Sequence, residues 1–247
     1  MKGSVCLERL RVRRGPTLAV DDVALTIAPG IWYGVIGANG AGKTSLLRAL
    51  AGRLPIASGV CKIDGIDLAT DREARARRIG FMPKAEMLPG VLTGREVLDL
   101  VARRAGGWRE ALGPLTDALE LTFLLDRKIA TCSAGMRQRI AIGCAFAMGH
   151  DLVILDEPFN SLDPVVGFDL RQALRVKVER DGLTLITALH DMMTFIAACD
   201  AGVLLGNGRV SLLLGGKDLA EGRADPVRFE RHLIDVLRSH GLDGRRT

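Results

Sequence analysis

A glycine-rich segment, GANGAGKTS (37–45), lies between an apolar run and a run with helical spacing. It fits the pattern G-x-x-x-x-G-K-[ST], with Gly37, Gly42, Lys43 and Thr44 in register. Glycines let backbone N–H groups surround phosphate oxygens, and a helix N-terminus adds a positive field. The lysine ammonium suits the β- and γ-phosphates, and the threonine hydroxyl suits Mg²⁺. We therefore expect a nucleotide-phosphate site, rather than a chance glycine-rich turn, formed by Gly37, Asn39, Gly40, Ala41, Gly42, Lys43, Thr44 and Ser45.

An acidic pair, Asp156 and Glu157, directly follows the aliphatic run LVIL (152–155). The run predicts a buried strand, and a carboxylate at the edge of a core costs free energy unless a cation or donor pairs with it. Beside a phosphate loop, an acid in this place helps to hold Mg²⁺, so we expect Asp156 to do so through a bound water. Glu157 is then free to polarise a water that attacks the γ-phosphate. A solvated strand end is the alternative interpretation.

The bulk composition excludes several classes of protein. The chain has 247 residues, of which 48% are hydrophobic and 26% charged, with a formal net charge of +5. No apolar run approaches the roughly 18–20 residues of a transmembrane helix, and the first residues lack the apolar core of a secretion signal. Because only 4% of the residues are aromatic, we expect a solvated basic surface rather than nucleic-acid binding. Five cysteines without a C-x-x-C pair predict free thiols and a cytoplasmic protein.

The order of the expected elements indicates an α/β domain. Alternating apolar residues before residue 28 predict strands, and from 93 to 130 the apolar spacing is helical. Ser133 and Asp163 are the expected N-caps of two further helices, the first running to about residue 149. Short aliphatic runs predict strands at 31–37, 77–83, 152–155 and 183–189, and Asn207-Gly208 predicts a hairpin turn.

Four further motifs stand in a fixed order around the acidic pair: IGFMPK (79–84), CSAGM (132–136), SLD (161–163) and His190 within LITALHD. Together with the phosphate loop, they resemble the nucleotide-binding domain of the ABC (ATP-binding cassette) ATPases over nearly the whole chain. The resemblance implies a P-loop NTPase core with an N-terminal antiparallel β-subdomain and an α-helical subdomain inserted at about 85–149. It also implies that residues 1–247 form a single ABC ATPase domain.

The resemblance implies ATP hydrolysis, with ATP and Mg²⁺ as the ligands and Lys43 among the catalytic residues. Two such domains sandwich two ATP molecules, each between the phosphate loop of one subunit and the CSAGM segment of the other. Ser133 and the backbone of Gly135 would therefore reach the γ-phosphate across the dimer, and Asp163 would lie at that interface. His190 would contact the γ-phosphate and orient Glu157, although on its own it could equally be a structural histidine.

Three positions depart from the family pattern. CSAGM replaces LSGGQ, so Ala134 removes a glycine and Met136 removes an amide. Lys84 replaces a glutamine, and an ammonium accepts no hydrogen bond. Its charge would suit the γ-phosphate and oppose Mg²⁺, and it could also face solvent. Arg14 takes the place of the aromatic residue that stacks on adenine, which a guanidinium plane can also do.

We expect the ATPase to be one subunit of a transporter whose membrane part is a separate permease. The segment 88–107 resembles the insert of exporter-type ATPases, which favours export, and exposed apolar residues near 81–92 would receive the permease. The protein would lie peripherally on the cytoplasmic face of the membrane as a homodimer or heterodimer, without nucleic acid. A soluble ABC ATPase, for example in cluster assembly or maintenance, is the alternative, whereas the motif order disfavours a generic P-loop kinase.

Overall fold

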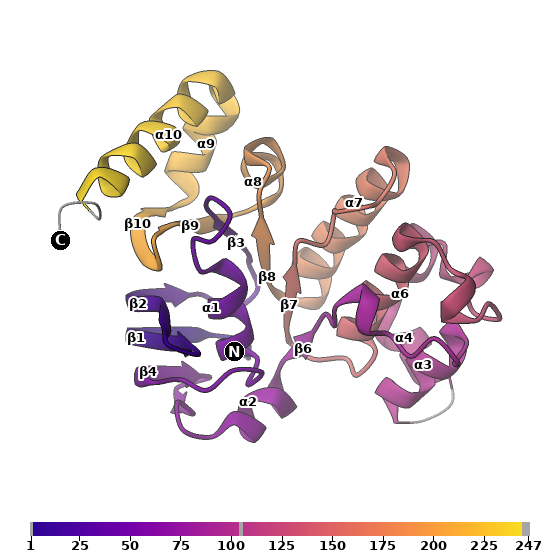
Figure 1. The fold of residues 1–247 in the computed structure, drawn as a ribbon. Helices are drawn as coiled ribbons and strands as arrows, with labels where there is room; N and C mark the ends of the chain where they lie inside the picture. The colour runs from indigo at the N-terminus through magenta and orange to yellow at the C-terminus, as the bar shows by residue number, and fades with distance from the viewer. Residues whose placement is uncertain (1, 104–105, 244–247) are drawn as a thin grey trace.

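The computed structural model describes residues 2–103 and 106–243, and its centre is a mixed sheet in the order β10-β9-β3-β8-β7-β6 (Figure 1). Neighbours from β9 to β6 are parallel, and β10 runs antiparallel to β9. Every residue of β3 and β8 is buried, as parallel strands covered on both faces require. The strands are Trp32–Ile36 (β3), Gly80–Phe81 (β6), Leu152–Asp156 (β7), Thr184–Leu189 (β8), Ala201–Gly206 (β9) and Arg209–Leu214 (β10).

A second, antiparallel sheet has the order β2-β1-β4-β5 and packs against the phosphate-loop side of the core. Within β1 the pairing register shifts between Leu7 and Val12, and Arg9 has a φ of 49°. This irregularity keeps both Leu10 and Val12 buried although the apolar alternation of the sequence is interrupted. The strands are Val5–Arg14 (β1), Thr17–Ile27 (β2), Ser58–Ile63 (β4) and Ile66–Asp67 (β5).

Two helices begin at the N-caps that the sequence predicts. Ser133 accepts a hydrogen bond from the N–H of Met136, and Asp163 accepts from the N–H groups of Val165 and Val166, so both predicted N-caps are confirmed. The α-helices are Lys43–Leu50 (α1), Arg72–Arg78 (α2), Gly94–Ala102 (α3), Trp108–Leu112 (α4), Leu115–Ala118 (α5), Ala134–Phe146 (α6), Pro164–Asp181 (α7), Met192–Ala198 (α8), Gly216–Ala224 (α9) and Pro226–Asp243 (α10).

Two sequence predictions of elements were too long. The strand expected at 77–83 is reduced to the two residues of β6, because α2 continues to Arg78. The helix expected to reach residue 149 ends at Phe146. Both errors concern where an element ends, which local propensity specifies weakly.

Helices α3 to α6 lie on the far side of the central sheet from the antiparallel strands (Figure 1). They fall within the expected insert at 85–149, of which residues 104–105 lie outside the described part. Their core is built around Trp108, which is fully buried and donates its indole N–H to Asp99 over 2.8 Å. Among the described helices, none has the length and apolar character needed to cross a bilayer.

Candidate active site

The glycine-rich loop connects β3 to α1 and contains two backbone conformations that require glycine. Gly37 has a φ of 155° and Gly42 a φ of 99°. A Cβ at Gly37 would collide with the carbonyl oxygen of Leu205, and one at Gly42 with that of Ala19. These two positions of the sequence pattern are therefore fixed by close backbone approach. The loop that they shape leads into the N-terminus of α1, where a helix favours an anion.

Lys43, the first residue of α1, is almost fully buried beneath this loop. Its ammonium donates hydrogen bonds to the carbonyl oxygens of Gly37 over 2.6 Å and Ala38 over 3.2 Å. Because an ammonium carries three N–H groups, one donor remains for a phosphate oxygen. Burial lowers the pKa of Lys43, while the nearby carboxylates of Glu157 and Asp156 oppose that shift. The hydrogen bonds to the loop hold the Lys43 ammonium in position before a phosphate binds.

Thr44 and Asp156 lie 112 positions apart in the sequence and come together in the fold. The Thr44 hydroxyl donates to the Oδ1 atom of Asp156 over 3.2 Å, which joins α1 to the end of β7. The pair offers one hydroxyl and one carboxylate oxygen, the hard donors that Mg²⁺ prefers. No group of three or more His, Cys, Asp or Glu side chains in the described chain could hold a metal alone. This pair therefore fits an ion that keeps waters and shares phosphate oxygens.

Glu157 has its backbone in the left-handed region, with a φ of 52°. Its N–H donates to the carbonyl of Ala188 in β8 over 3.2 Å, and its Oε2 accepts from the Asn160 amide over 2.7 Å. His190 follows β8 and is exposed, and the partner that the structure gives the Glu157 carboxylate is Asn160. Sequence reasoning missed Asn160. Its position three residues after Glu157, in the loop that follows the acidic pair, places its amide within reach of the Glu157 carboxylate.

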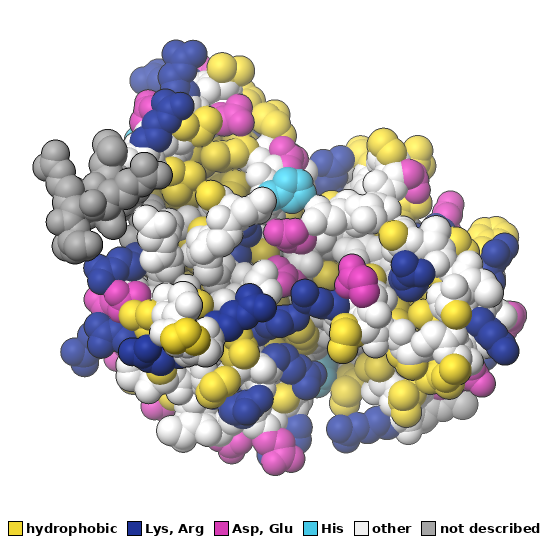
Figure 2. Space-filling model, viewed as in Figure 1, with side chains coloured by type: hydrophobic (Ala, Val, Ile, Leu, Met, Phe, Trp, Pro, Cys, Tyr) yellow, Lys and Arg dark blue, Asp and Glu magenta, His cyan; other side chains and the backbone are white. Residues whose placement is uncertain are grey.

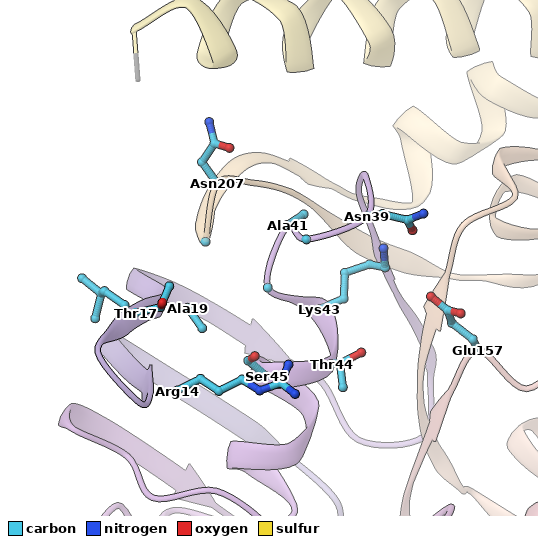
Figure 3. A pocket seen from close by; sticks show the side chains of 14 residues that line it. Arg14, Thr17, Ala19, Asn39, Ala41, Lys43, Thr44, Ser45, Glu157 and Asn207 are labelled. Carbon is cyan, nitrogen blue, oxygen red and sulfur yellow. The ribbon is translucent and has the colours of Figure 1, made fainter. Parts of the chain in front are cut away.

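The loop, Glu157 and Arg14 line one cavity of about 680 Å³. Figure 3 shows the Glu157 carboxylate facing Lys43 across this cavity, with Arg14 on the opposite wall near Ser45. Arg14 thus lies where an adenine contact is expected, at the end of β1. The aromatic side chains of Trp32 and Tyr33 are buried in the core and do not line it. Asn207 and Gly208, the predicted hairpin turn, close the rim.

Lys84 lines a second cavity, of about 320 Å³, on the other side of the acidic pair. Thr44, Asp156 and Glu157 contribute to its wall, so Lys84 belongs to the same site rather than to an unrelated surface. Its side chain is exposed, at the start of the 3₁₀ turn Ala85–Met87. Figure 2 shows Lys and Arg side chains gathered across the middle of this face, beside Asp and Glu side chains, which favours attraction of an anionic substrate.

The CSAGM segment lies outside both cavities. Ser133 is exposed at the N-terminus of α6, and Gly135 is half-buried in its first turn. Ala134 is the first helical residue, a conformation open to any L residue, so the lost glycine causes no strain there. Asp163 is exposed and caps α7. Ser133, Gly135 and Asp163 therefore do not line the nucleotide cavity of their own chain. This agrees with the expectation that they act on the nucleotide of a second copy.

Comparison with known proteins decides the family. A family model described as "ABC transporter" matches residues 20–160, more than half of the chain. The chain belongs to the ABC transporter family. It is an ATP-binding subunit of that family and an ATPase. This confirms the P-loop NTPase fold, with an antiparallel β-subdomain and a helical subdomain, that the motif order implied.

Relatives that are named for different functions match at similar identity. The hemin import ATP-binding protein HmuV of Pseudomonas entomophila is 34% identical over 82% of this chain and 83% of its own length. The Nod factor export ATP-binding protein I of Sinorhizobium fredii is 30% identical over 97% of this chain and 69% of its length. The ATP-binding cassette sub-family A member 7 of Mus musculus is 34% identical over 86% of this chain, which spans 10% of that longer protein.

A solved structure supports the same fold. The structure titled "Structure of ATP binding subunit of ABC transporter" superimposes with a TM-score of 0.80 and 27% sequence identity. The match covers 93% of this chain and 99% of that one. The similarity therefore extends over the phosphate loop, the helical part and the C-terminal strands together.

Proposed function

We propose that this chain is the ATP-hydrolysing subunit that powers a separate transmembrane permease, through ATP-driven pairing of two nucleotide-binding domains. The observation that carries the proposal is the contact between Thr44 and Asp156, which assembles a hydroxyl–carboxylate pair at the mouth of the phosphate loop. Glu157 lies in the same cavity, so a water can be held between that carboxylate and the γ-phosphate. The arrangement suits hydrolysis as well as binding.

In this proposal each residue has one task. The N–H groups of the loop and the free donor of Lys43 hold the β- and γ-phosphates, and Arg14 stacks on the adenine. Thr44 and Asp156 hold Mg²⁺, which when bound neutralises charge on the phosphate oxygens. Glu157 accepts a hydrogen bond from the attacking water, and the exposed His190 reaches the γ-phosphate in the closed dimer.

The second nucleotide-binding domain supplies the rest of the site. Ser133 and Gly135 stand at the exposed N-terminus of a helix of 13 residues, whose partial positive charge favours the γ-phosphate of the facing copy. Asp163 is also exposed, at the N-terminus of α7. Because none of the three lines the cavity of its own chain, a dimer completes the site, as a homodimer or with a related subunit.

The permease contact is proposed at the segment 81–92. Met87 is 77% exposed and Val91 81% exposed, and both flank Leu88, which anchors the segment in the core. The segment includes Lys84 and so connects the permease surface to the nucleotide site. The protein then lies peripherally on the cytoplasmic face of the membrane. No observation favours the alternative of an ABC ATPase without a transport role.

Export is the proposed direction, and it rests on the resemblance of segment 88–107 to exporter-type inserts. The names of the relatives include both import and export, so they do not favour either direction. Reconstituted vesicles that carry the permease, loaded with candidate cargo, test the direction. Loss of cargo from the compartment that contains the ATPase supports export, and accumulation there contradicts it.

The proposal is tested by isolating tagged protein from gently solubilised membranes, with and without ATP, and identifying what it retains by mass spectrometry. We expect a membrane protein with several spans, and ATP should change its retention. The same experiment with a Met87→Ser, Val91→Ser double variant should lose the partner while ATP binding persists. Retention of soluble proteins alone would contradict a transport function.

A further inference from the structure

Gln138 is a buried amide on α6 that none of the sequence motifs accounts for. Its side chain is 8% exposed, within a helix that begins at Ser133. Burying an amide costs free energy unless its donors and acceptor find partners, so the contacts of Gln138 identify what it is there to hold.

The Nε2 atom of Gln138 donates to two consecutive backbone carbonyl oxygens, those of Glu157 and Pro158, each over 3.2 Å. Carbonyl oxygens only accept, so the NH₂ group and not the amide oxygen must face them. The side chain therefore binds the backbone at the end of the acidic pair. It comes from a helix that starts at Ala134, 23 residues before Glu157 in the sequence.

Three separate elements fix Glu157. Its N–H is held by Ala188 of β8, its carbonyl by Gln138 of α6, and its carboxylate by Asn160 of the same loop. The left-handed backbone of Glu157 is a shape that non-glycine residues rarely adopt, so it persists only because neighbouring groups impose it. Removing the Gln138 donor takes away one of these constraints on the direction of the carboxylate.

The first turn of α6 packs on the same loop at a second point. A Cβ at Gly135 would lie 2.6 Å from the carbonyl oxygen of Ser161, so the helix and the loop are in close backbone contact. Ser161 also has a left-handed backbone, with a φ of 63°. The helix that presents Ser133 to the partner is thus attached to the segment 157–161 both at its first turn and one turn later.

We propose that Gln138 is a positioning residue: it holds the backbone of Glu157 so that the carboxylate faces the nucleotide, and it links that geometry to the helix that carries Ser133. The inference rests on the proposed role of Glu157. Since the N-terminus of α6 receives the nucleotide of the other subunit, closure of the dimer moves the helix that orients the catalytic carboxylate in its own chain.

The test compares the full chain carrying Gln138→Met with a matched control, Gln172→Met, at the exposed glutamine of α7. Methionine keeps the length of the side chain and removes the N–H groups. We expect kcat for Mg-ATP hydrolysis to fall about 10- to 100-fold, as misplaced reacting groups do. The Kd for ATP and the thermal midpoint should match those of the control. Gln138→Asn, which withdraws the donor by one methylene, replaces the methionine variant if that variant fails to fold.

Glu157→Gln and the double variant with Gln138→Met complete the cycle. If Gln138 acts through Glu157, the double variant turns over as slowly as Glu157→Gln alone, because residues that act as a unit are not additive. A wild-type kcat in Gln138→Met, or parallel losses of kcat, ATP affinity and thermal midpoint, would overturn the inference. Wild-type turnover in Glu157→Gln would instead refute the proposed role of Glu157.

Discussion

The hydroxyl of Thr44 donates to the carboxylate of Asp156 over 3.2 Å, although 112 positions separate the two residues. The contact joins the first turn of α1 to the end of β7, so the phosphate loop and the acidic strand end are assembled as one site. Both oxygens are hard ligands, so Thr44 and Asp156 would hold Mg²⁺ at the junction of these two elements.

Asp156→Asn should raise the thermal stability of the metal-free chain while it removes a proposed ligand of Mg²⁺. Burial raises the pKa of Asp156, and the Thr44 bond only partly opposes the shift. A raised pKa means that ionisation is less favourable in the folded chain, so this group lowers the free energy of unfolding as pH rises through that pKa. At neutral pH the variant should melt at a higher temperature than wild type in EDTA, and this difference should shrink at acidic pH.

The same variant should gain no thermal stability from Mg-ATP beyond what it gains from ATP in EDTA. Wild type should show that extra gain, because a ligand that binds the native state stabilises it. Differential scanning fluorimetry with and without the metal measures both effects. A lower midpoint for Asp156→Asn in EDTA would show that the Asp156 carboxylate stabilises the metal-free fold, contrary to the direction of its pKa shift.

Lys84→Gln should weaken binding of ATP more than binding of ADP. Lys84 lines the cavity that contains Thr44 and Glu157, so its charge would act on a terminal phosphate bound there. Because Lys84 is exposed, solvent screens the interaction, and we expect a loss of about fivefold or less in ATP affinity. Equilibrium fluorescence binding is the measurement, with the exposed Lys217→Gln as control. Equal effects on ATP and ADP would place Lys84 away from the γ-phosphate.

Met136→Gln should strengthen the start of α6. The N–H of Ser133 donates to the Met136 sulfur over 3.5 Å, and a thioether is a weak acceptor. A glutamine oxygen completes a better capping box, worth about 0.5 kcal/mol of stability. It also returns an amide to the proposed dimer interface, so ATPase activity should rise at low protein concentration. Met148→Gln, outside this helix, is the control, and unchanged activity would argue against a role in trans.

Arg75→Met should destabilise the chain strongly. The guanidinium is fully buried and donates to the carbonyls of Ala49, Leu54, Leu68 and Ala69, which ties α2 to the end of α1. Leaving these oxygens without their donor should cost about 3 kcal/mol or more in urea unfolding. The exposed Arg77→Met should change stability by less than about 0.5 kcal/mol. A neutral result at Arg75 would mean that an apolar side chain packs there equally well.

Sequence reasoning is most informative where the signal is local. The N-caps Ser133 and Asp163 are confirmed, because capping depends on the next three residues. The motif and the adjacent aliphatic strand indicate where Lys43, Thr44, Asp156 and Glu157 lie, and their roles stay predictions. The structure adds that Arg14, the last residue of β1, lines the same cavity as the loop.

What sequence reasoning missed depends on contacts between distant elements. Gln138 reads as a polar helix residue, and only the packing of α6 on the loop after β7 shows that it is buried against Glu157. Arg75 lies in a run of charges, where a solvated basic surface was expected, yet it is fully buried. In both cases long-range packing overrides the local pattern.

The central claim, that Glu157 performs the chemistry at a site assembled by the loop and the acidic pair, is tested most directly by Glu157→Gln. ATP binding and steady-state hydrolysis are measured on the same preparation. We predict ATP affinity within about twofold of wild type and a kcat lower by about 10²- to 10⁴-fold, the usual contribution of a general base. Hydrolysis at the wild-type rate would contradict the claim.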